Sequence, residues 1–370
     1  MLGAIDRGEV NAVCSPLSAQ VALTMVGMGA AGQTLAQMED ALGGSMDELA
    51  RAANTLSQQL EVIGDAEREE DDDEAPEPAR ASLVNGTWLQ EGYEIQESYL
   101  EDLATWFGSG LWEADFTEDA AREEARSEIN DWVSDSTNDL IEELIPEGFL
   151  AAETRLVLVN ALHLKAAWPT ELGKSGGTFT TAGGEERSTE MLHGSTATWH
   201  EDELCRATSL DTYGGALALA LVQPTGELDE VLDAWAEDSA ALSALLSGLE
   251  DSQVSTQLSM PAFDIDWDAS LKEVLGSLGM TDAFTDAADL SGITGQADLL
   301  ISDVVHKAVI TVDEQGMEAA AATAVAMDTT SADVEMQELV LDSPFLFVAY
   351  ERETLAPLVV GWIGDPTQTR

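Results

Sequence analysis

Basic residues are scarce in this chain: its 370 residues include 15 Lys and Arg against 71 Asp and Glu, a formal net charge of −56 at pH 7. Such a charge repels nucleic acids, anionic membranes and heparin-like polyanions, so we expect none of these as partners. A disordered acidic protein is one explanation, but the 45% hydrophobic content and the nine Trp argue against it. We favour a halophilic, prokaryotic protein, because concentrated salt shortens the screening length to about 3 Å at 1 M.

Cysteines and long apolar runs are rare as well. Cys14 and Cys205 are the only two cysteines, too few for a disulfide scaffold, and Cys14 lies in an apolar run that predicts a buried thiol. No apolar stretch reaches the roughly 20 residues of a membrane helix. Residues 1–9 lack a basic region followed by an apolar core, so no signal peptide is visible, although the true start could lie upstream.

Enzyme motifs are absent or misplaced. Residues 27–32 have the spacing of a dinucleotide fingerprint, but that motif needs a preceding strand, and the run here is helical, so we interpret its glycines as a helix end. The four histidines form no zinc-like pair. His200 and Cys205 flank residues 201–203, which we interpret as a solvated charge run. We therefore expect no enzyme, no cofactor and no metal.

The order of elements predicts an α+β fold without regular βαβ alternation. Periodicity predicts helices at 17–29, 33–42, 46–63, 120–137, 228–249 and 271–278. Pro16 opens the first of these, and Ser15 is expected to cap it. It predicts strands at 83–90, 155–168, 254–263, 304–312 and 345–350. Residues 65–80 contain an acidic run and two prolines, so we expect a disordered insertion there.

Residues 314–323 are the most informative stretch, because four consecutive alanines follow Gly316 and Met317 in it. Alanine favours a helix. Alternate positions from Met317 to Met327 carry no charge, however, and a strand places such positions on one face. Both interpretations stay open: an alanine-rich helix, and a mobile loop able to enter a sheet as an extra strand.

Several segments resemble the serpins, a family of serine protease inhibitors. Residues 11–18 are similar to the family pattern N-x-x-F-S-P-x-S, with Cys14 in place of Phe, and residues 28–38 are similar to G-A-x-G-x-T-x-x-Q-[ML]. The other matching segments are 130–137 (N-x-W-V-x-x-x-T), 158–168 (V-N-A-x-x-F-K-x-x-W), 305–308 and 314–323 (hinge), and 344–347 and 361–366 (C-terminal signature).

The resemblance implies one serpin domain over residues 1–370, with three β-sheets, eight to nine helices and an exposed reactive-centre loop at 314–342. It also implies a suicide mechanism, in which a serine protease cleaves the loop and the loop enters the main sheet as a new strand. The implied protein is an extracellular monomer that needs no cofactor. The alternative is a non-inhibitory serpin-fold protein with a binding or chaperone-like role.

The resemblance also assigns site residues. The hinge comprises Glu314, Gly316, Met317, Glu318, Ala319, Ala320, Ala321, Ala322 and Thr323. A hydrogen-bonded cluster that could hold the sheet closed comprises Ser15, Ser18, Asn160 and His306. Trp168 is assigned to the breach, the part of the main sheet next to the hinge. Gly316 is expected to supply permissive backbone dihedrals at the pivot.

The scissile bond follows from family spacing. Counting seventeen residues from Glu314 places it at Thr330–Ser331, whereas counting back from Pro344 places it at Asp333–Val334. We prefer Thr330 because the hinge side is more constrained, and a small polar residue suits an elastase- or subtilisin-like protease.

Two departures from the family matter for the expected mechanism. Met317 replaces the usual Thr or Ser and is expected to slow insertion, which would turn an inhibitor into a substrate. Few residues precede Asn11, where the family has a further helix, so either that helix is missing or the true start differs.

Overall fold

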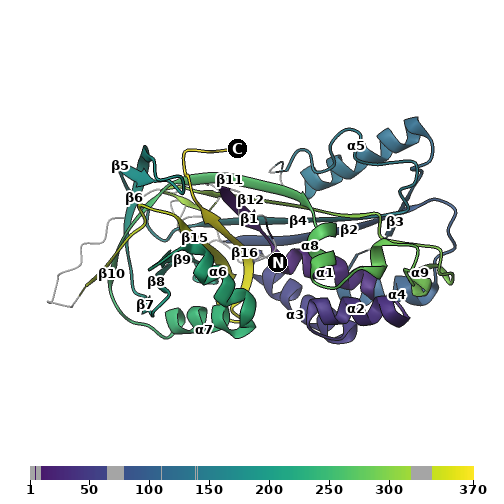
Figure 1. Cartoon of the computed structure of the whole chain (residues 1–370), viewed down its shortest axis with the longest axis horizontal. Helices are drawn as coiled ribbons and strands as arrows, with labels where there is room; N and C mark the ends of the chain where they lie inside the picture. The colour runs from purple at the N-terminus through teal and green to yellow at the C-terminus, as the bar shows by residue number, and fades with distance from the viewer. Residues whose placement is uncertain are drawn as a thin grey trace, which may run out of the picture.

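The computed structural model describes residues 5, 10–64, 79–109, 111–137, 139, 141–317 and 336–370. These residues form three β-sheets and nine α-helices, which confirms the predicted α+β fold class (Figure 1). The helices are α1 (Pro16–Gly27), α2 (Gly32–Leu42), α3 (Met46–Gly64), α4 (Glu97–Phe107), α5 (Asp119–Ser136), α6 (Leu228–Glu237), α7 (Ser239–Glu250), α8 (Lys272–Ser277) and α9 (Ser291–Thr294), with the 3-10 helix η2 (Asp282–Phe284).

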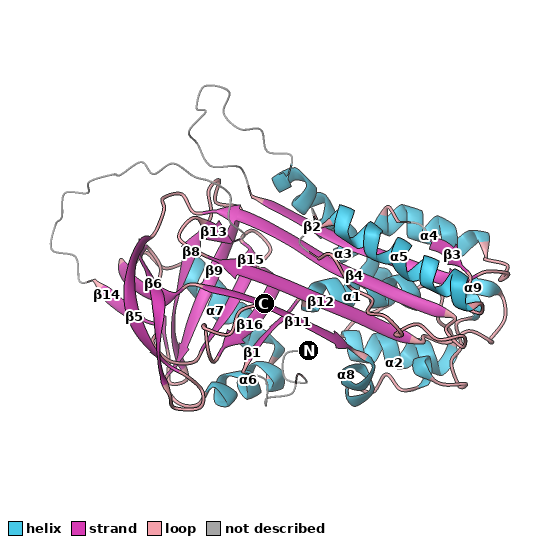
Figure 2. Cartoon of the chain, turned by 90° about the horizontal axis from the view of Figure 1, so that it is seen from above, coloured by secondary structure: helices cyan, strands magenta, loops and turns pink. Residues whose placement is uncertain are grey.

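The main sheet has six strands in the order β11-β12-β13-β4-β2-β3. Their bounds are β11 (Phe263–Ser270), β12 (Asp303–Val312), β13 (Gly316–Met317), β4 (Leu156–Ala167), β2 (Arg80–Gln90) and β3 (Leu111–Ala114). The long strands β4 and β12 run parallel through its centre (Figure 2). Helix α5 covers one face through Ile129 and Val133, while α1, α2 and α4 pack below the other (Figure 1).

A second six-stranded sheet, in the order β1-β16-β15-β9-β8-β7, packs against the main sheet. Its strands are β1 (Asn11–Cys14), β16 (Ala356–Ile363), β15 (Phe345–Glu351), β9 (Leu217–Pro224), β8 (Cys205–Asp211) and β7 (His200–Glu201). All of β15 and most of β9 are buried, because the main sheet covers one face and α6 and α7 cover the other. This explains their nearly continuous apolar sequences.

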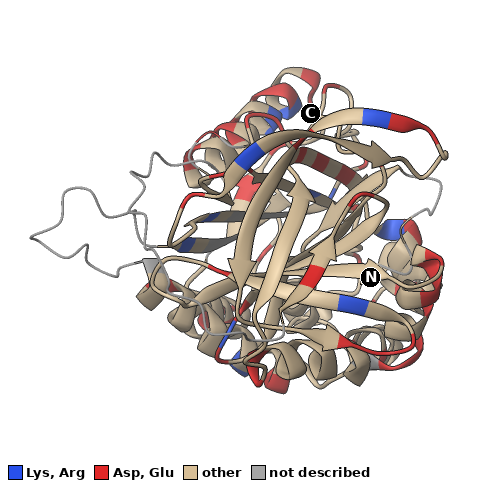
Figure 3. Ribbon diagram, turned by 90° about the vertical axis from the view of Figure 1, so that its left-hand side faces the viewer, with Lys and Arg blue, Asp and Glu red and all other residues tan. Residues whose placement is uncertain are grey.

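The third sheet has the order β14-β10-β6-β5. Its strands are β14 (Gln337–Val340), β10 (Thr256–Pro261), β6 (Glu186–Thr196) and β5 (Gly173–Thr180). The largest hydrophobic cluster joins all three sheets and includes Trp168, Phe179, Phe263, Phe345 and Phe347. Asp and Glu gather on the outer helices and turns and are few on the central strands, so most of the negative charge faces solvent (Figure 3).

Several predictions of local structure are confirmed. Ser15 caps α1 by accepting a hydrogen bond from the Ser18 N–H, and Pro16 opens the helix as expected. Cys14 is fully buried on β1. The run at 27–32 joins the end of α1 to the start of α2, so no strand precedes it and a dinucleotide fingerprint is excluded. Among the described residues, no helix has the length and apolar character needed to cross a membrane.

Other predicted boundaries are wrong. The helix expected at 228–249 is two helices, because the Asp238 carboxylate accepts the Ala240 N–H and caps a new helix there. The strand expected at 254–263 ends at Pro261, and β11 begins at Phe263. Helix α4 was not predicted at all.

The bounds predicted for the loops at 65–80 and 314–342 include residues that lie in strands. Of the insertion expected at 65–80, residues 65–78 lie outside the described residues, but Ala79 is buried and Arg80 begins β2. Of the loop expected at 314–342, both ends are strands, Gly316–Met317 in the main sheet and Gln337–Val340 in the third.

Candidate functional site

The hinge begins inside the main sheet. Strand β13 lies between β12 and β4 and is antiparallel to both: Met317 pairs with Val312 on one side and with Ala166 on the other, and Gly316 pairs with Ala167. Met317 is fully buried in the hydrophobic cluster that joins the three sheets. The start of an extra strand is therefore already in place between two parallel strands.

A tight turn connects β12 to this hinge. The Asp313 carboxylate accepts hydrogen bonds from the N–H groups of Gln315 (2.8 Å) and Gly316 (3.1 Å). Trp168, the predicted breach residue, fixes the turn twice: its backbone N–H donates to the Gln315 carbonyl (2.8 Å) and its indole N–H donates to the Asp313 carbonyl (2.9 Å). Trp168 is itself 1% exposed, so the anchor is rigid.

Glu314 is tied to the third sheet. The Lys174 ammonium on β5 lies 3.0 Å from a Glu314 carboxylate oxygen and 2.9 Å from a Glu190 oxygen on β6. A hydrogen bond from its own backbone N–H and the bond from Lys174 lower the pKa of Glu314. The Leu172 N–H also donates to the Glu314 carbonyl (2.8 Å). Sequence reasoning missed Lys174, because nothing local links it to a residue far along the chain.

The requirement for glycine at position 316 differs from the expected one. Gly316 is not among the glycines with positive φ, so permissive dihedrals are not its role. A Cβ atom there would lie 2.3 Å from the Ala166 carbonyl oxygen and 2.9 Å from the Ala167 Cα. Glycine is needed because the hinge backbone approaches β4 too closely for any side chain.

Three of the four residues in the predicted cluster meet below the hinge. The Ser15 N–H donates to His306 Nε2 (3.1 Å), and the Ser18 N–H donates to Ser15 Oγ (3.3 Å), with all three residues fully buried. Burial lowers the pKa of His306 to about 4, so the ring is neutral at pH 7 and Nε2 acts as an acceptor. The backbone of Asn160 pairs with His306, while its side chain lies outside the described residues.

Strands β4 and β12 are joined along only part of their length. Residues 303–307 of β12 pair with 157–161 of β4, and β13 separates the strands at Val312 and Ala166. The Ser15–His306 bond lies at the closed segment, because His306 belongs to the paired part of β12. Strands β4 and β12 are therefore separated by β13 at the hinge end and paired directly with each other further along.

The rest of the predicted reactive loop is not placed. Glu318, the four alanines and Thr323 lie outside the described residues. The same holds for both candidate scissile bonds, Thr330–Ser331 and Asp333–Val334. Their roles stay predictions, as does the choice between helix and strand beyond Met317.

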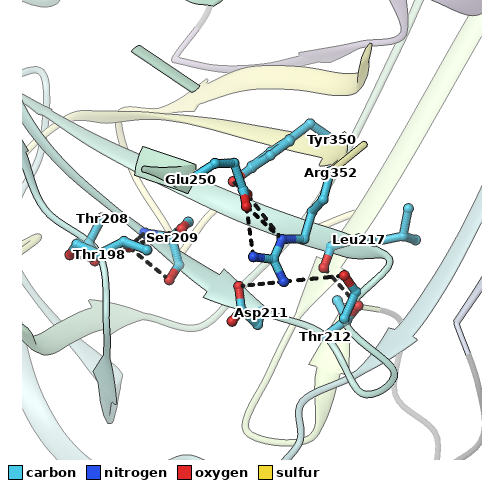
Figure 4. Close-up of polar contacts among 10 residues, drawn as sticks. Thr198, Thr208, Ser209, Asp211, Thr212, Leu217, Glu250, Tyr350 and Arg352 are labelled. Carbon is cyan, nitrogen blue, oxygen red and sulfur yellow. Dashed lines mark hydrogen bonds and ion pairs between the residues drawn. The ribbon is translucent and has the colours of Figure 1, made fainter. Parts of the chain in front are cut away.

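A second polar cluster lies at the end of β15 (Figure 4). The Arg352 guanidinium donates to both carboxylate oxygens of Glu250 (Nε 3.0 and 3.1 Å; a terminal nitrogen 2.7 Å) and lies 3.5 Å from Asp211. The Tyr350 hydroxyl donates to Glu250 (2.7 Å). Burial raises the pKa of Glu250, but these bonds outweigh it and lower the pKa overall. These contacts tie α7, β8 and β15 together, which is a structural role.

Comparisons with known proteins point to one family. A family model described as "Serpin (serine protease inhibitor)" matches residues 4–366. A serine protease inhibitor of Cyanea capillata is 32% identical over 381 residues, which cover 98% of this chain and 94% of that protein. The native structure of the thermophilic serpin tengpin superposes with a TM-score of 0.84 at 26% identity, covering 98% of this chain and 90% of tengpin.

A further similar structure supports the fold alone. Human thyroxine-binding globulin, solved in complex with thyroxine, gives a TM-score of 0.80 at 23% identity, and the match covers 97% of this chain and 92% of the globulin. The same architecture therefore occurs in a protein named for binding a small molecule.

Proposed function

The chain belongs to the serpin family, and we propose that it is an irreversible suicide inhibitor of serine proteases. The observation that best supports this proposal is β13, the start of a strand that lies antiparallel between β4 and β12. A cleaved loop could extend this strand without any change in its direction.

The register of β13 predicts where the cleaved loop would lie. Because Met317 stands opposite Ala166, each later loop residue would stand one position further back along β4. Thr323 would then lie between Asn160 and His306, in the segment where β4 and β12 are now paired. Full insertion must therefore break this pairing.

The burial of Met317 also predicts which side chains of the inserted strand would face the core. Since its side chain lies in the hydrophobic cluster between the sheets, Ala319, Ala321 and Thr323 would face the same core, two residues apart along the strand. These side chains are small or uncharged. The charge of Glu318 would point to the opposite face.

Inhibition would begin as ordinary proteolysis at the predicted bond. The protease serine attacks the Thr330 carbonyl carbon, an ester forms, and the peptide bond breaks as the Ser331 nitrogen takes a proton and leaves. The loop, still esterified to the protease, then enters the sheet before water hydrolyses the ester. Thr330 favours an elastase- or subtilisin-like target, and this specificity is part of the proposal.

Incubation with subtilisin in concentrated salt tests the proposal. We expect a conjugate that resists SDS, with a mass equal to the sum of both proteins less the released C-terminal peptide. Nicking near residue 330 should also raise the melting temperature, because the inserted strand completes the sheet. Cleavage without any conjugate and without a higher melting temperature would overturn the proposal.

A composition-matched variant gives the control. The double substitution Glu318→Ala/Ala319→Glu moves one carboxylate from the outer face to the face expected to enter the core, and it changes nothing else. We expect the double variant to be cleaved without forming a conjugate, while Glu318→Ala alone still forms one. Equal amounts of conjugate from the two variants would contradict the prediction that residue 319 faces the core.

A non-inhibitory serpin-fold protein is the second candidate. It is favoured by Met317, which occupies the position where the family has a small polar residue and is already packed in the core. In that case the protease would cut the loop and then dissociate, still intact and active.

A further inference from the structure

We propose that His200, Asp202 and Cys205 form a binding site for a divalent transition metal such as Zn²⁺, on the hairpin between β7 and β8. One ligand atom from each residue lies within 4.8 Å of the other two. The three side chains offer nitrogen, oxygen and sulfur, which together suit Zn²⁺ or Co²⁺, whereas Mg²⁺ and Ca²⁺ prefer oxygen alone. The site is independent of the reactive loop.

Residues 201–203 are exposed, as a solvated charge run should be, but the thiol that follows them is buried. Cys205 is 2% exposed and belongs to the hydrophobic cluster under α6 and α7. The side chains of His200 and Asp202 are 23% and 47% exposed. A metal ion would therefore have the thiolate beneath it, the other two ligands beside it, and solvent access for a water as the fourth ligand.

A tight hairpin aligns the three ligands. His200 pairs with Ala207 across the hairpin, and the chain reverses between Asp202 and Cys205. One oxygen of the Asp202 carboxylate accepts the N–H groups of Leu204 and Cys205, both at 2.8 Å. The other oxygen faces His200 Nε2 at 3.1 Å. The carboxylate is thus held with one oxygen directed toward the other two ligands.

Neighbouring elements hold the hairpin in position. The Thr225 N–H donates to the Leu204 carbonyl (2.8 Å), and its hydroxyl donates to the Glu203 carbonyl (2.7 Å). On the other side, α7 presents Gly248 to the imidazole, where a Cβ atom would lie 3.3 Å from His200 Nδ1. The absence of a side chain at Gly248 leaves room for the ring in this orientation.

The distances fit tetrahedral coordination after a small closure. Bonds of about 2.0–2.3 Å from zinc to nitrogen, oxygen and sulfur imply that neighbouring ligand atoms lie roughly 3.3–3.7 Å apart. The His200–Asp202 distance of 3.1 Å is already close to this range, and no pair of ligand atoms exceeds 4.8 Å. The thiolate and the carboxylate would balance the two positive charges of the ion.

Metal binding should release a proton. Cysteine binds a metal as the thiolate, so the ion has to displace the proton of the Cys205 thiol. We therefore expect the addition of metal to acidify a weakly buffered solution.

Titration of the reduced, chelator-treated full chain with Co²⁺ tests the site. We expect a sulfur-to-cobalt charge-transfer band in the near ultraviolet that saturates at one equivalent and disappears when Zn²⁺ is added. Cys205→Ser and His200→Gln should lose the band, and Cys14→Ser should keep it. No band in the wild type, or a band that survives in Cys205→Ser, overturns the proposal.

Two further variants separate metal binding from folding. Asp202→Asn keeps an oxygen for the Leu204 and Cys205 N–H groups but removes the charge, so it should fold and bind Co²⁺ at least tenfold more weakly. Equal affinity in this variant would contradict a role for the carboxylate. His200→Gln should form the protease conjugate as the wild type does, so failure of the metal site and failure of the inhibitor proposal are distinguishable.

Discussion

Acid should destabilise this protein through one buried histidine. In the folded chain His306 is fully buried and neutral, and its Nε2 accepts the Ser15 N–H at 3.1 Å. Protonation would remove that acceptor and place a positive charge in a buried site between the main sheet and α1. The unfolded chain pays neither cost, because its imidazole is hydrated.

The size and direction of the effect follow from the pKa difference. The pKa of His306 is lowered from 6.5 to about 4 in the folded protein. Between these values the unfolded chain binds more protons than the folded one, so stability falls as the pH drops through this window. At 1.36 kcal/mol per pKa unit, the full loss by pH 4 is roughly 3 kcal/mol.

Urea unfolding of wild type and His306→Gln across pH 4–7.5, in concentrated salt, measures this contribution. The many carboxylates titrate in both proteins, so their effect cancels in the difference between the two curves. We expect the wild type to lose roughly 3 kcal/mol more than the variant between pH 7 and pH 4. His193→Gln, at an exposed histidine, is the matched control and should behave as wild type.

A constant difference between wild type and His306→Gln over that range would refute the reasoning. It would mean that His306 has the same proton affinity in the folded and unfolded chains. The Ser15–His306 bond could then not hold β12 closed through a neutral imidazole.

Three other predictions concern the hinge. Gly316→Ala places a methyl group against the Ala166 carbonyl, so we expect the free energy of unfolding to fall by about 1–3 kcal/mol and the melting temperature to fall with it. An unchanged melting temperature would show that the hinge can leave the sheet without loss of stability. Lys174→Met breaks the partly exposed pairs with Glu314 and Glu190 and should lower the melting temperature slightly at low salt and less at molar salt; an equal loss at both would contradict an ionic contact. Met317→Thr should lower the stoichiometry of inhibition if the methionine slows insertion, and a value equal to wild type would remove that concern.

Much of the local structure was predictable, because caps and periodicity act over a few residues. Ser15 and Pro16 marked the start of α1, and the apolar run at 155–168 marked a buried central strand. The prediction failed where a local cap interrupted a continuous helical pattern, as Asp238 does between α6 and α7. The salt-adapted prokaryotic source stays a prediction, since neither the fold nor the family bears on it.

The amino-acid sequence alone determined the α+β class, the family motifs, the hinge segment and the excess of negative charge, since each is written in neighbouring residues or in composition. Only the tertiary structure decided that Met317 already lies in the sheet, that Lys174 holds Glu314, and that Gly316 is needed for close approach to β4. It also decided that Cys205 is buried beside His200 and Asp202. These relations join separate strands or depend on what covers a side chain, and strand pairing and burial are set when the whole chain packs.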